Sequence, residues 1–245
     1  MALPSLSTTF GAAMLVVGLL VVAVSARHVW RTSAVLRADA TERIEGVADG
    51  TLVRVSGTVE AADTVTAPFS GAACVALRTV VEERRPGALL LPTYVTIHEP
   101  TESVPFDVRT PHAAVSVAAP FRTVALASTV VATVGPGDDP PPRIDAYERR
   151  ADDLPRETVF RSPPAILAPI TRALSLGTRR YSERRASPGD AVTVVGRVEG
   201  GRVDPLVVSD AAPRRTLVRL SKTSLAGLLV GGFGLLLGVA LLLGG

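Results

Sequence analysis

The chain has 245 residues with 26 basic and 23 acidic side chains, which give a net charge of +3. The basic residues are scattered among the acids and form no stripe with interleaved aromatic side chains, so the composition disfavours nucleic-acid binding. A single cysteine, Cys74, excludes an intrachain disulfide framework and a zinc site built from several cysteines.

The chain begins with an apolar segment. Residues 1–26 carry no charged side chain, and the run from Phe10 to Ala26 would span about 26 Å as a helix, close to the roughly 30 Å of a hydrocarbon core. This predicts an N-terminal transmembrane helix over residues 1–26. A signal peptide is the alternative, but a retained anchor is favoured because no lysine or arginine precedes the apolar run.

Residues 27–50 predict a short juxtamembrane helix. The apolar residues Leu36, Ala40, Ile44 and Val47 recur at spacings of four, four and three, which is the period of a helical face. This helix is expected to pack on the domain that follows.

Residues 51–222 change to valine-rich alternation broken by proline and glycine, the pattern of antiparallel strands. Strands are predicted at 51–61, 73–83, 93–99, 104–110, 113–119, 121–134, 191–200, 201–210 and 215–221. Residues 152–185 are compatible with a helix alone or with a helix followed by a strand. The predicted fold class is therefore a mainly β domain with minor α (α+β), flanked by two transmembrane α-helices.

Residues 223–245 predict the second transmembrane helix, whose apolar run from Leu225 to Leu243 would reach about 28 Å. Four glycines share one face of this helix: Gly227, Gly231, Gly234 and Gly238. Small residues let helices approach closely in lipid, so this face is expected to contact either the first span, at Gly11 and Gly18, or a second copy of the chain. The alternative is that glycine is simply frequent in membrane helices.

Basic side chains flank both spans on the side of the central region. Arginines follow the first span at 27, 31 and 37, and four basic residues at 214, 215, 219 and 222 precede the second. The positive-inside rule then predicts a two-pass cell-membrane protein with its central domain in the cytoplasm. The alternative is that these residues belong to the folded domain.

No catalytic, cofactor-binding or metal-binding constellation is predicted. The chain has no phosphate loop, dinucleotide fingerprint or nucleophile elbow. Its three histidines are far apart in sequence, and His98 is interpreted as a surface side chain. Cys74 lies in the apolar run AACVAL and is interpreted as a buried structural thiol.

Several stretches occur in the order found in one known family. GTVEAADTVTAPFSGAACVALRTVVEE, SVPFDV, RRYSERRASPGDAVTVVGRVE and LVRLSKTS resemble the GIDE domain, also called the beside-a-membrane domain, of membrane-embedded RING ubiquitin ligases and their prokaryotic relatives. The residues that carry the resemblance are Gly57, Pro68, Ser70, Gly71, Cys74, Pro105, Phe106, Asp107, Tyr181, Glu183, Pro188, Gly189 and Gly196.

Gly57 and Gly196 lie in two similar Val-x-Gly-x-Val-Glu stretches. These are either paired repeats or a coincidence of valine-rich strands, and each glycine predicts a bulge or a close backbone approach.

The family's ligases carry a zinc-binding RING after the second span, whereas this sequence ends there and lacks the cysteine and histidine ligands. The resemblance therefore implies a membrane-anchored binding or sensing module without its own RING, with the bilayer and a protein as partners and with homo-oligomers formed through the C-terminal span as one option. The alternative is a component of a ubiquitin-like ligase pathway in which a partner supplies the transfer chemistry. An enzyme ranks third, for want of candidate residues.

Overall fold

The computed structural model describes residues 6–32, 38–87, 91–120, 124–210 and 213–243, and within the two long helices it describes the side chains of residues 9–26 and 227–243. These residues form two compact units. One consists of the two chain ends, Met1–Ala38 and Ala212–Gly245, and the other is Asp39–Ala211.

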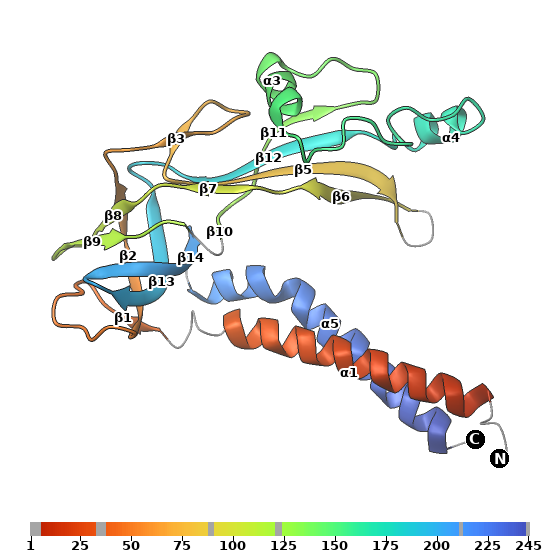
Figure 1. Cartoon of the computed structure of the whole chain (residues 1–245), viewed down its shortest axis with the longest axis horizontal. Coiled ribbons are helices and arrows are strands. Elements are labelled where there is room, and N and C mark those ends of the chain that lie inside the picture. Colours follow the sequence, from red (N-terminus) through yellow and green to blue (C-terminus); the bar gives the residue numbers. More distant parts are fainter. Residues whose placement is uncertain (1–5, 33–37, 88–90, 121–123, 211–212, 244–245) are drawn as a thin grey trace. The chain divides into compact units, whose positions relative to one another are not determined.

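The first unit is a pair of long helices, α1 (Leu6–Thr32) and α5 (Pro213–Leu243), which lie side by side (Figure 1). They run antiparallel, because Gly11 near the start of α1 lies against Gly238 near the end of α5. Among the described side chains, Thr9–Ala26 of α1 is long and apolar enough to cross a membrane, and the apolar part of α5, Gly227–Leu243, is shorter.

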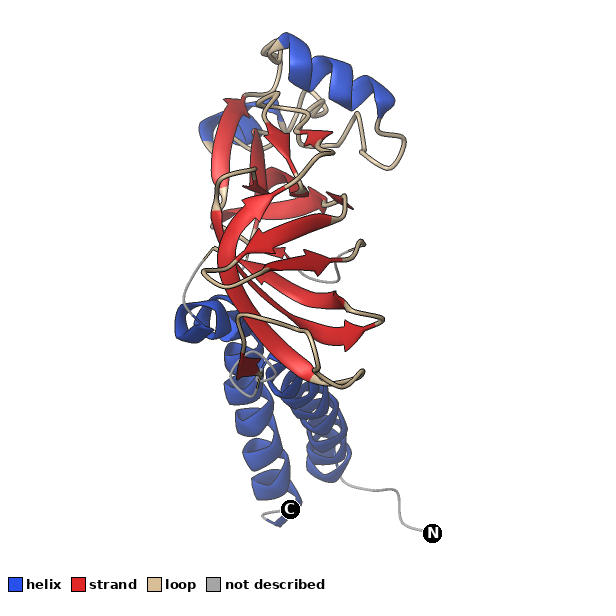
Figure 2. Cartoon of the chain, turned by 90° about the vertical axis from the view of Figure 1, so that its left-hand side faces the viewer, coloured by secondary structure: helices blue, strands red, loops and turns tan. Residues whose placement is uncertain are grey.

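The second unit is built mainly of strands (Figure 2). Five of them form a closed barrel: β2 (Leu52–Glu60), β8 (Phe106–Arg109), β9 (Ala114–Val117), β13 (Ala191–Glu199) and β14 (Arg202–Ser209). The barrel closes because β2 pairs with β13 on one side and with β8 on the other. Two short strands, β1 (Asp39–Ala40) and β10 (Val124–Ala125), pair with β2 and β14.

The connectivity of this barrel is that of the OB fold, a five-stranded Greek-key barrel. Hairpins join β8 to β9 and β13 to β14, both hairpins pair with β2, and the parallel pairing of β14 with β9 completes the ring. The interior is filled by valines that alternate along the strands, among them Val53, Val55, Val108, Val194 and Val203.

A second sheet is made from the two long insertions into the barrel, one between β2 and β8 and the other between β9 and β13. Its strands are β11 (Thr129–Val134), β12 (Arg179–Ala186), β5 (Ala76–Pro86), β6 (Pro92–His98) and β7 (Thr101–Ser103). The short strands β3 (Val65–Thr66) and β4 (Ala73–Cys74) pair with each other, and the helices α3 (Pro142–Arg150) and α4 (Ala168–Ala173) complete the insertions. Ile144 of α3 packs with Val81, Val134 and Tyr181 of the sheet in a separate small core.

The mainly β character of the central region is confirmed, and residues 152–185 contain a helix followed by a strand. The stretch 121–134, predicted as one strand, contains the two strands β10 and β11, while 121–123 lie outside the described residues.

The juxtamembrane helix predicted over 27–50 is wrong. Helix α1 continues to Thr32, and residues 38–50 contain β1 and turns, while Leu36 lies outside the described residues. Ile44 and Val47 nevertheless pack against the barrel core. The N–H of Val47 donates to the carbonyl of Ile44 at 3.1 Å, so a tight turn reproduces the three-residue spacing of a helix.

The strand predicted at 215–221 is also wrong, because α5 begins at Pro213 and includes these residues. Proline is well suited to the first position of a helix, since its fixed φ fits and its missing N–H would have no partner there. The segment whose β-branched residues predicted a strand is the first part of α5, and the helix continues from it without a break into its apolar part.

Candidate functional site

The centre of the second sheet carries a buried charge cluster. Arg179 of β12 is paired directly across from Glu83 of β5, and both side chains are fully buried. Arg179, Tyr181 and Glu183 alternate along β12, so all three project from the same face of the sheet.

Arg179 joins several elements. Its Nε lies 3.5 Å from Glu83 Oε2, and its NH1 donates to Glu148 Oε1 of α3 at 2.6 Å. Its NH2 donates to the carbonyl oxygens of Pro155 and Arg156. Burial opposes the charge, but the hydrogen bond to Glu148 and the charge of that carboxylate raise the pKa of Arg179, so the side chain is cationic. The charge thus holds α3 and the following loop on the sheet.

Glu183 binds the turn between β3 and β4. Its Oε1 accepts the N–H groups of Phe69 at 2.7 Å and Ser70 at 3.1 Å, and its Oε2 accepts the Ser70 hydroxyl at 2.5 Å. Arg185 NH1 lies 3.2 Å from the same carboxylate. These donors satisfy the oxygens of the buried carboxylate. Two of the residues singled out by the family resemblance, Ser70 and Glu183, are therefore brought together in a structural contact.

Aromatic rings connect this turn to α3. The ring of Phe69 lies edge-on to Tyr147, at 5.1 Å, and to Tyr181, at 5.4 Å. The hydroxyl of Tyr181 donates to Glu148. Burial and this hydrogen bond raise the pKa of Tyr181 to about 12, so the phenol keeps its proton.

Beside this cluster lies an open groove of about 870 Å³, between α3 and the segments around β3 and β7. Its wall includes the hydrogen-bonded pair of His98 Nε2 and the Tyr147 hydroxyl, 2.8 Å apart. Burial and the charge of Glu102 raise the pKa of Tyr147 to about 12. The lining residues are Thr66, Ala67, Pro68, His98, Pro100, Glu102, Pro142, Arg143, Ala146, Tyr147, Arg150, Ala151, Asp152 and Asp153.

The groove contains charges of both signs that are not neutralised. Arg143 and Arg150 stand on α3, and Glu102, Asp152 and Asp153 carry the opposite charge. Within the part of the chain that the structure describes, none of these five side chains is in a salt bridge. The guanidinium of Arg143 packs over Gly71, whose φ of +76° suits a residue without a Cβ.

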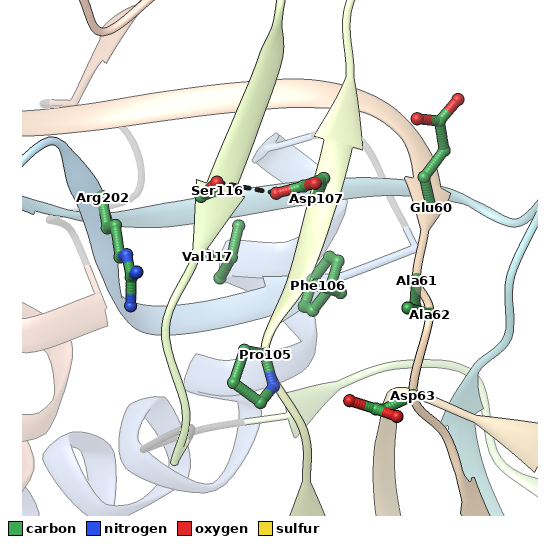
Figure 3. A pocket seen from close by; sticks show the side chains of 10 residues that line it. All are labelled: Glu60, Ala61, Ala62, Asp63, Pro105, Phe106, Asp107, Ser116, Val117 and Arg202. Atoms are coloured by element: carbon green, nitrogen blue, oxygen red, sulfur yellow. Dashed lines mark hydrogen bonds between the residues drawn. The ribbon is translucent and has the colours of Figure 1, made fainter.

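A smaller hollow of about 250 Å³ lies on the barrel, with Pro105, Phe106 and Val117 at its centre (Figure 3). Asp107 accepts a hydrogen bond from the hydroxyl of Ser116 at 2.7 Å. Arg202 lies across the hollow from Glu60 and Asp63. OB folds bind ligands on the face of their second and third strands, here β8 and β9. The three carboxylates at this position suit a nucleic-acid phosphate poorly.

The remaining residues taken from the family resemblance lie away from both cavities. Pro188 and Gly189 form the turn between β12 and β13. Cys74 is fully buried beside Ala67 and Leu77, and burial, followed by the charge of Glu183, raises its thiol pKa to about 11. The thiol is therefore protonated near neutral pH and is not suited to act as a nucleophile.

Gly57 and Gly196 mark close backbone approaches. A Cβ on Gly57 would lie 2.2 Å from the carbonyl oxygen of Arg109, and one on Gly196 would lie 2.2 Å from that of Asp204. Neither glycine has a positive φ, and only Gly196 adjoins a register shift, in its pairing with β14. The two similar stretches are the neighbouring antiparallel strands β2 and β13. Each glycine lies against the other neighbour of its own strand in the barrel, which is β8 for Gly57 and β14 for Gly196.

The glycines of α5 face α1. Ideal Cβ atoms on Gly231 and Gly238 would lie 3.1 Å and 2.9 Å from the carbonyl oxygens of Gly18 and Gly11, and Gly227 faces Ser25. Gly234 approaches the Cα of Gly18. The adjacent Gly232 has nothing within 4 Å.

The residues that organise the groove are not evident from the sequence. Arg179, Glu148 and Tyr147 were not singled out, and His98 is half-buried rather than on the open surface. The sequence does carry a signal for Arg179. One face of an antiparallel sheet is expected to be apolar, but arginines and glutamates occupy both faces of the strands EERR and RRYSERR, so some of these charges must be buried. The pairing of Tyr147 with His98 had no such signal.

Among the described residues, no group of three or more histidine, cysteine, aspartate or glutamate side chains could hold a metal ion. No protein-family model matches the chain, and neither a curated protein nor a solved structure is significantly similar to it. The resemblance to the GIDE domain thus rests on the motifs in the sequence alone.

Proposed function

We propose that this chain is a membrane-anchored, GIDE-like binding module that holds a segment of a partner protein in the groove beside α3. The observation that carries the proposal is the groove itself, where basic and acidic side chains without a salt bridge to any described residue surround the Tyr147–His98 pair.

The chemistry of the groove suits a polypeptide. Small-molecule sites are mostly apolar and enclose their ligand, whereas this groove is open and its charges are of both signs. Pro68, Pro100 and Pro142 add rigid apolar surface to the walls, and Tyr147 is of a type enriched in protein interfaces. A protein segment with acidic and basic side chains would satisfy both sets of charges.

Membrane anchoring is supported by the helical pair. It buries glycines between its helices and exposes large apolar side chains, with Leu19 61% and Leu229 77% exposed. A soluble helical pair would show the opposite pattern, with its large apolar side chains at the contact. In a bilayer, lipid tails would surround these apolar side chains, and the close packing of glycines would stabilise the contact between the two helices.

The flanking basic residues support a two-pass protein of the cell membrane with its central unit in the cytoplasm. In intact cells, a Gly137→Cys variant should resist a membrane-impermeant maleimide and should react after permeabilisation. Position 137 suits this test because it lies in an open turn with nothing within 4 Å. Rapid labelling in intact cells would reverse the orientation.

Groove binding is tested by photo-crosslinking from position 146. A photoreactive residue at Ala146 should give a discrete protein adduct in native membranes, and Arg150→Glu should abolish it. Arg149→Glu is the matched control, since Arg149 stands on the same helix, lies outside the groove and pairs with Asp145. Equal loss with both variants, or no adduct from position 146, would contradict the proposal. An adduct with a RING protein or a ubiquitin-like modifier would instead favour the ligase-pathway alternative.

A further inference from the structure

The loop that carries α4 presents apolar side chains to solvent. Ile166 is 85% exposed, Val159 60%, Ile170 57% and Leu167 41%. No charged residue occurs from Ser162 to Thr171, and the loop projects beyond the ends of β5 and β12 (Figure 1). Large aliphatic side chains gathered on one projection mark an interaction site in a protein.

The base of this loop is firmly held. The N–H of Gly177 donates to the carbonyl of Arg84 at 2.8 Å, and a Cβ on Gly177 would lie 2.3 Å from the carbonyl oxygen of Phe160. The hydroxyl of Thr158 donates to Glu83 Oε2 at 3.0 Å. Leu176 and Thr171 are buried. The tip is therefore presented by an ordered base rather than by a loose segment.

The composition of the tip favours lipid over a protein surface as its partner. Its large exposed side chains are branched aliphatics, which transfer favourably into hydrocarbon, and the half-buried Phe160 is its only aromatic residue. The other exposed residues between positions 162 and 170 are a serine, an alanine and two prolines. Energetic centres of protein interfaces are enriched in tryptophan, tyrosine and arginine. At the edge of the tip Arg172 is exposed, where it would meet anionic headgroups.

We infer that the tip formed by Val159, Ile166, Leu167 and Ile170 inserts into the surface of the bilayer as a third membrane contact. This inference rests on the proposed membrane anchoring. Only three residues, 210–212, separate β14 from α5, so an anchored α5 keeps the central unit beside lipid and raises the effective concentration of lipid for the tip.

The test uses the full chain in vesicles of zwitterionic and anionic lipid, with an environment-sensitive fluorophore on a single introduced cysteine. Native Cys74 is buried and labels poorly, which the unsubstituted chain checks. Three sites are compared: Ile166→Cys at the tip, Gly137→Cys in an open turn as the control, and Leu236→Cys, 73% exposed, in α5.

At position 166 the emission should shift to the blue and be quenched by a lipid that carries its quencher near the headgroup, as expected for side chains buried roughly 5–10 Å into the interface. Position 137 should show neither effect. Adding Ile170→Asp should abolish the quenching at position 166, because a carboxylate resists transfer into lipid.

Position 236 is probed with a lipid that carries its quencher on the acyl chain, because it lies near the middle of the apolar run. Quenching at 236 without quenching at 166 would overturn the inference and leave the anchor intact. A blue shift at 166 without quenching would also overturn it, because the tip would then contact protein. Loss of quenching at both 166 and 236 would remove the proposed anchoring as well.

Discussion

At the scale of single residues, the charges buried in the second sheet act as structural connectors. Arg179, Glu83 and Glu183 are fully enclosed, yet each has a partner of opposite charge and contacts an element far away in the sequence. Such pairs add little net stability over apolar residues of the same size, but removing one partner leaves the other buried and uncompensated. Their effect is to fix where α3 and the β3–β4 turn sit, and these two elements wall the groove.

Arg179→Met should therefore lower the free energy of unfolding by about 3–5 kcal/mol, since Glu148 loses its buried partner. Glu83 loses one of its two cationic partners and keeps Arg85, whose Nε lies 2.9 Å from Glu83 Oε1. Arg180→Met is the matched control. Arg180 is the next residue on β12, is partly exposed, pairs with Glu82 and stacks on Tyr94. Its loss should cost under about 1 kcal/mol. Denaturant unfolding of both variants checks this, and equal costs would show that the buried charge has no special role.

Cys74 should be unreactive in the folded protein. With its pKa raised to about 11, the thiol should react at pH 8 on the order of a hundredfold more slowly than an ordinary cysteine of pKa about 8.5. A colorimetric thiol reagent measures this rate, and Gly137→Cys supplies a freely exposed thiol for comparison. Fast reaction of Cys74 without unfolding would contradict its burial.

The same shift predicts a pH dependence of stability. Because folding raises the thiol pKa, the unfolded chain loses this proton first, at a pH near 8.5. The contribution of Cys74 is thus fully present below that pH and is lost as the pH approaches 11. Cys74→Ala should flatten the fall in stability between these values. An unchanged pH profile in that variant would contradict the assignment.

At the scale of elements, two kinds of close packing define the two units, and both depend on glycine. In the barrel, Gly57 and Gly196 let the backbone of a neighbouring strand approach. In the helical pair, the glycines of α5 let α1 approach. The sequence predicted a bulge or a close backbone approach at Gly57 and Gly196. A close backbone approach is the feature that both glycines have in common.

Gly57→Ala and Gly196→Ala should each cost several times the ~1 kcal/mol of an ordinary Gly-to-Ala change, because a Cβ would force two strands apart. Gly137→Ala is the comparison, since its Cβ meets no atom and only its φ of +86° is strained. Thermal unfolding of the three variants checks the order. Costs at 57 and 196 no larger than at 137 would mean that the barrel adjusts freely.

Gly231→Leu should separate the two helices, whereas Gly232→Leu, one residue along and facing open space, should not. A disulfide between Ser25→Cys and Gly227→Cys reports the distance, because a Cβ on Gly227 would lie 3.4 Å from that of Ser25. Oxidation in membranes should give the disulfide in the parent and in the Gly232→Leu chain. An undiminished yield in Gly231→Leu would show that the glycine face is not the contact.

At the scale of the whole molecule, the sequence predicts helices and strands correctly wherever a residue pattern is compatible with only one type of secondary structure. Alternation of valines predicted most strands, and the apolar runs predicted both long helices. It failed at residues 38–50, where turns imitate the spacing of a helix, and at 215–221, where β-branched residues continue a helix that starts at Pro213. The barrel's closure and the groove depend on contacts between residues far apart in the sequence, such as Thr58 with Arg109 in the barrel and His98 with Tyr147 in the groove, which local patterns do not specify.

Membrane anchoring is tested most directly by alkaline extraction of membranes from cells that express the full chain. Two packed apolar helices within the bilayer withstand the high pH and salt that release peripheral proteins, because the contact is hydrophobic rather than electrostatic. The chain should stay with the sedimented bilayers and should be released only by detergent. Its appearance in the alkaline supernatant would contradict a membrane-embedded helical pair.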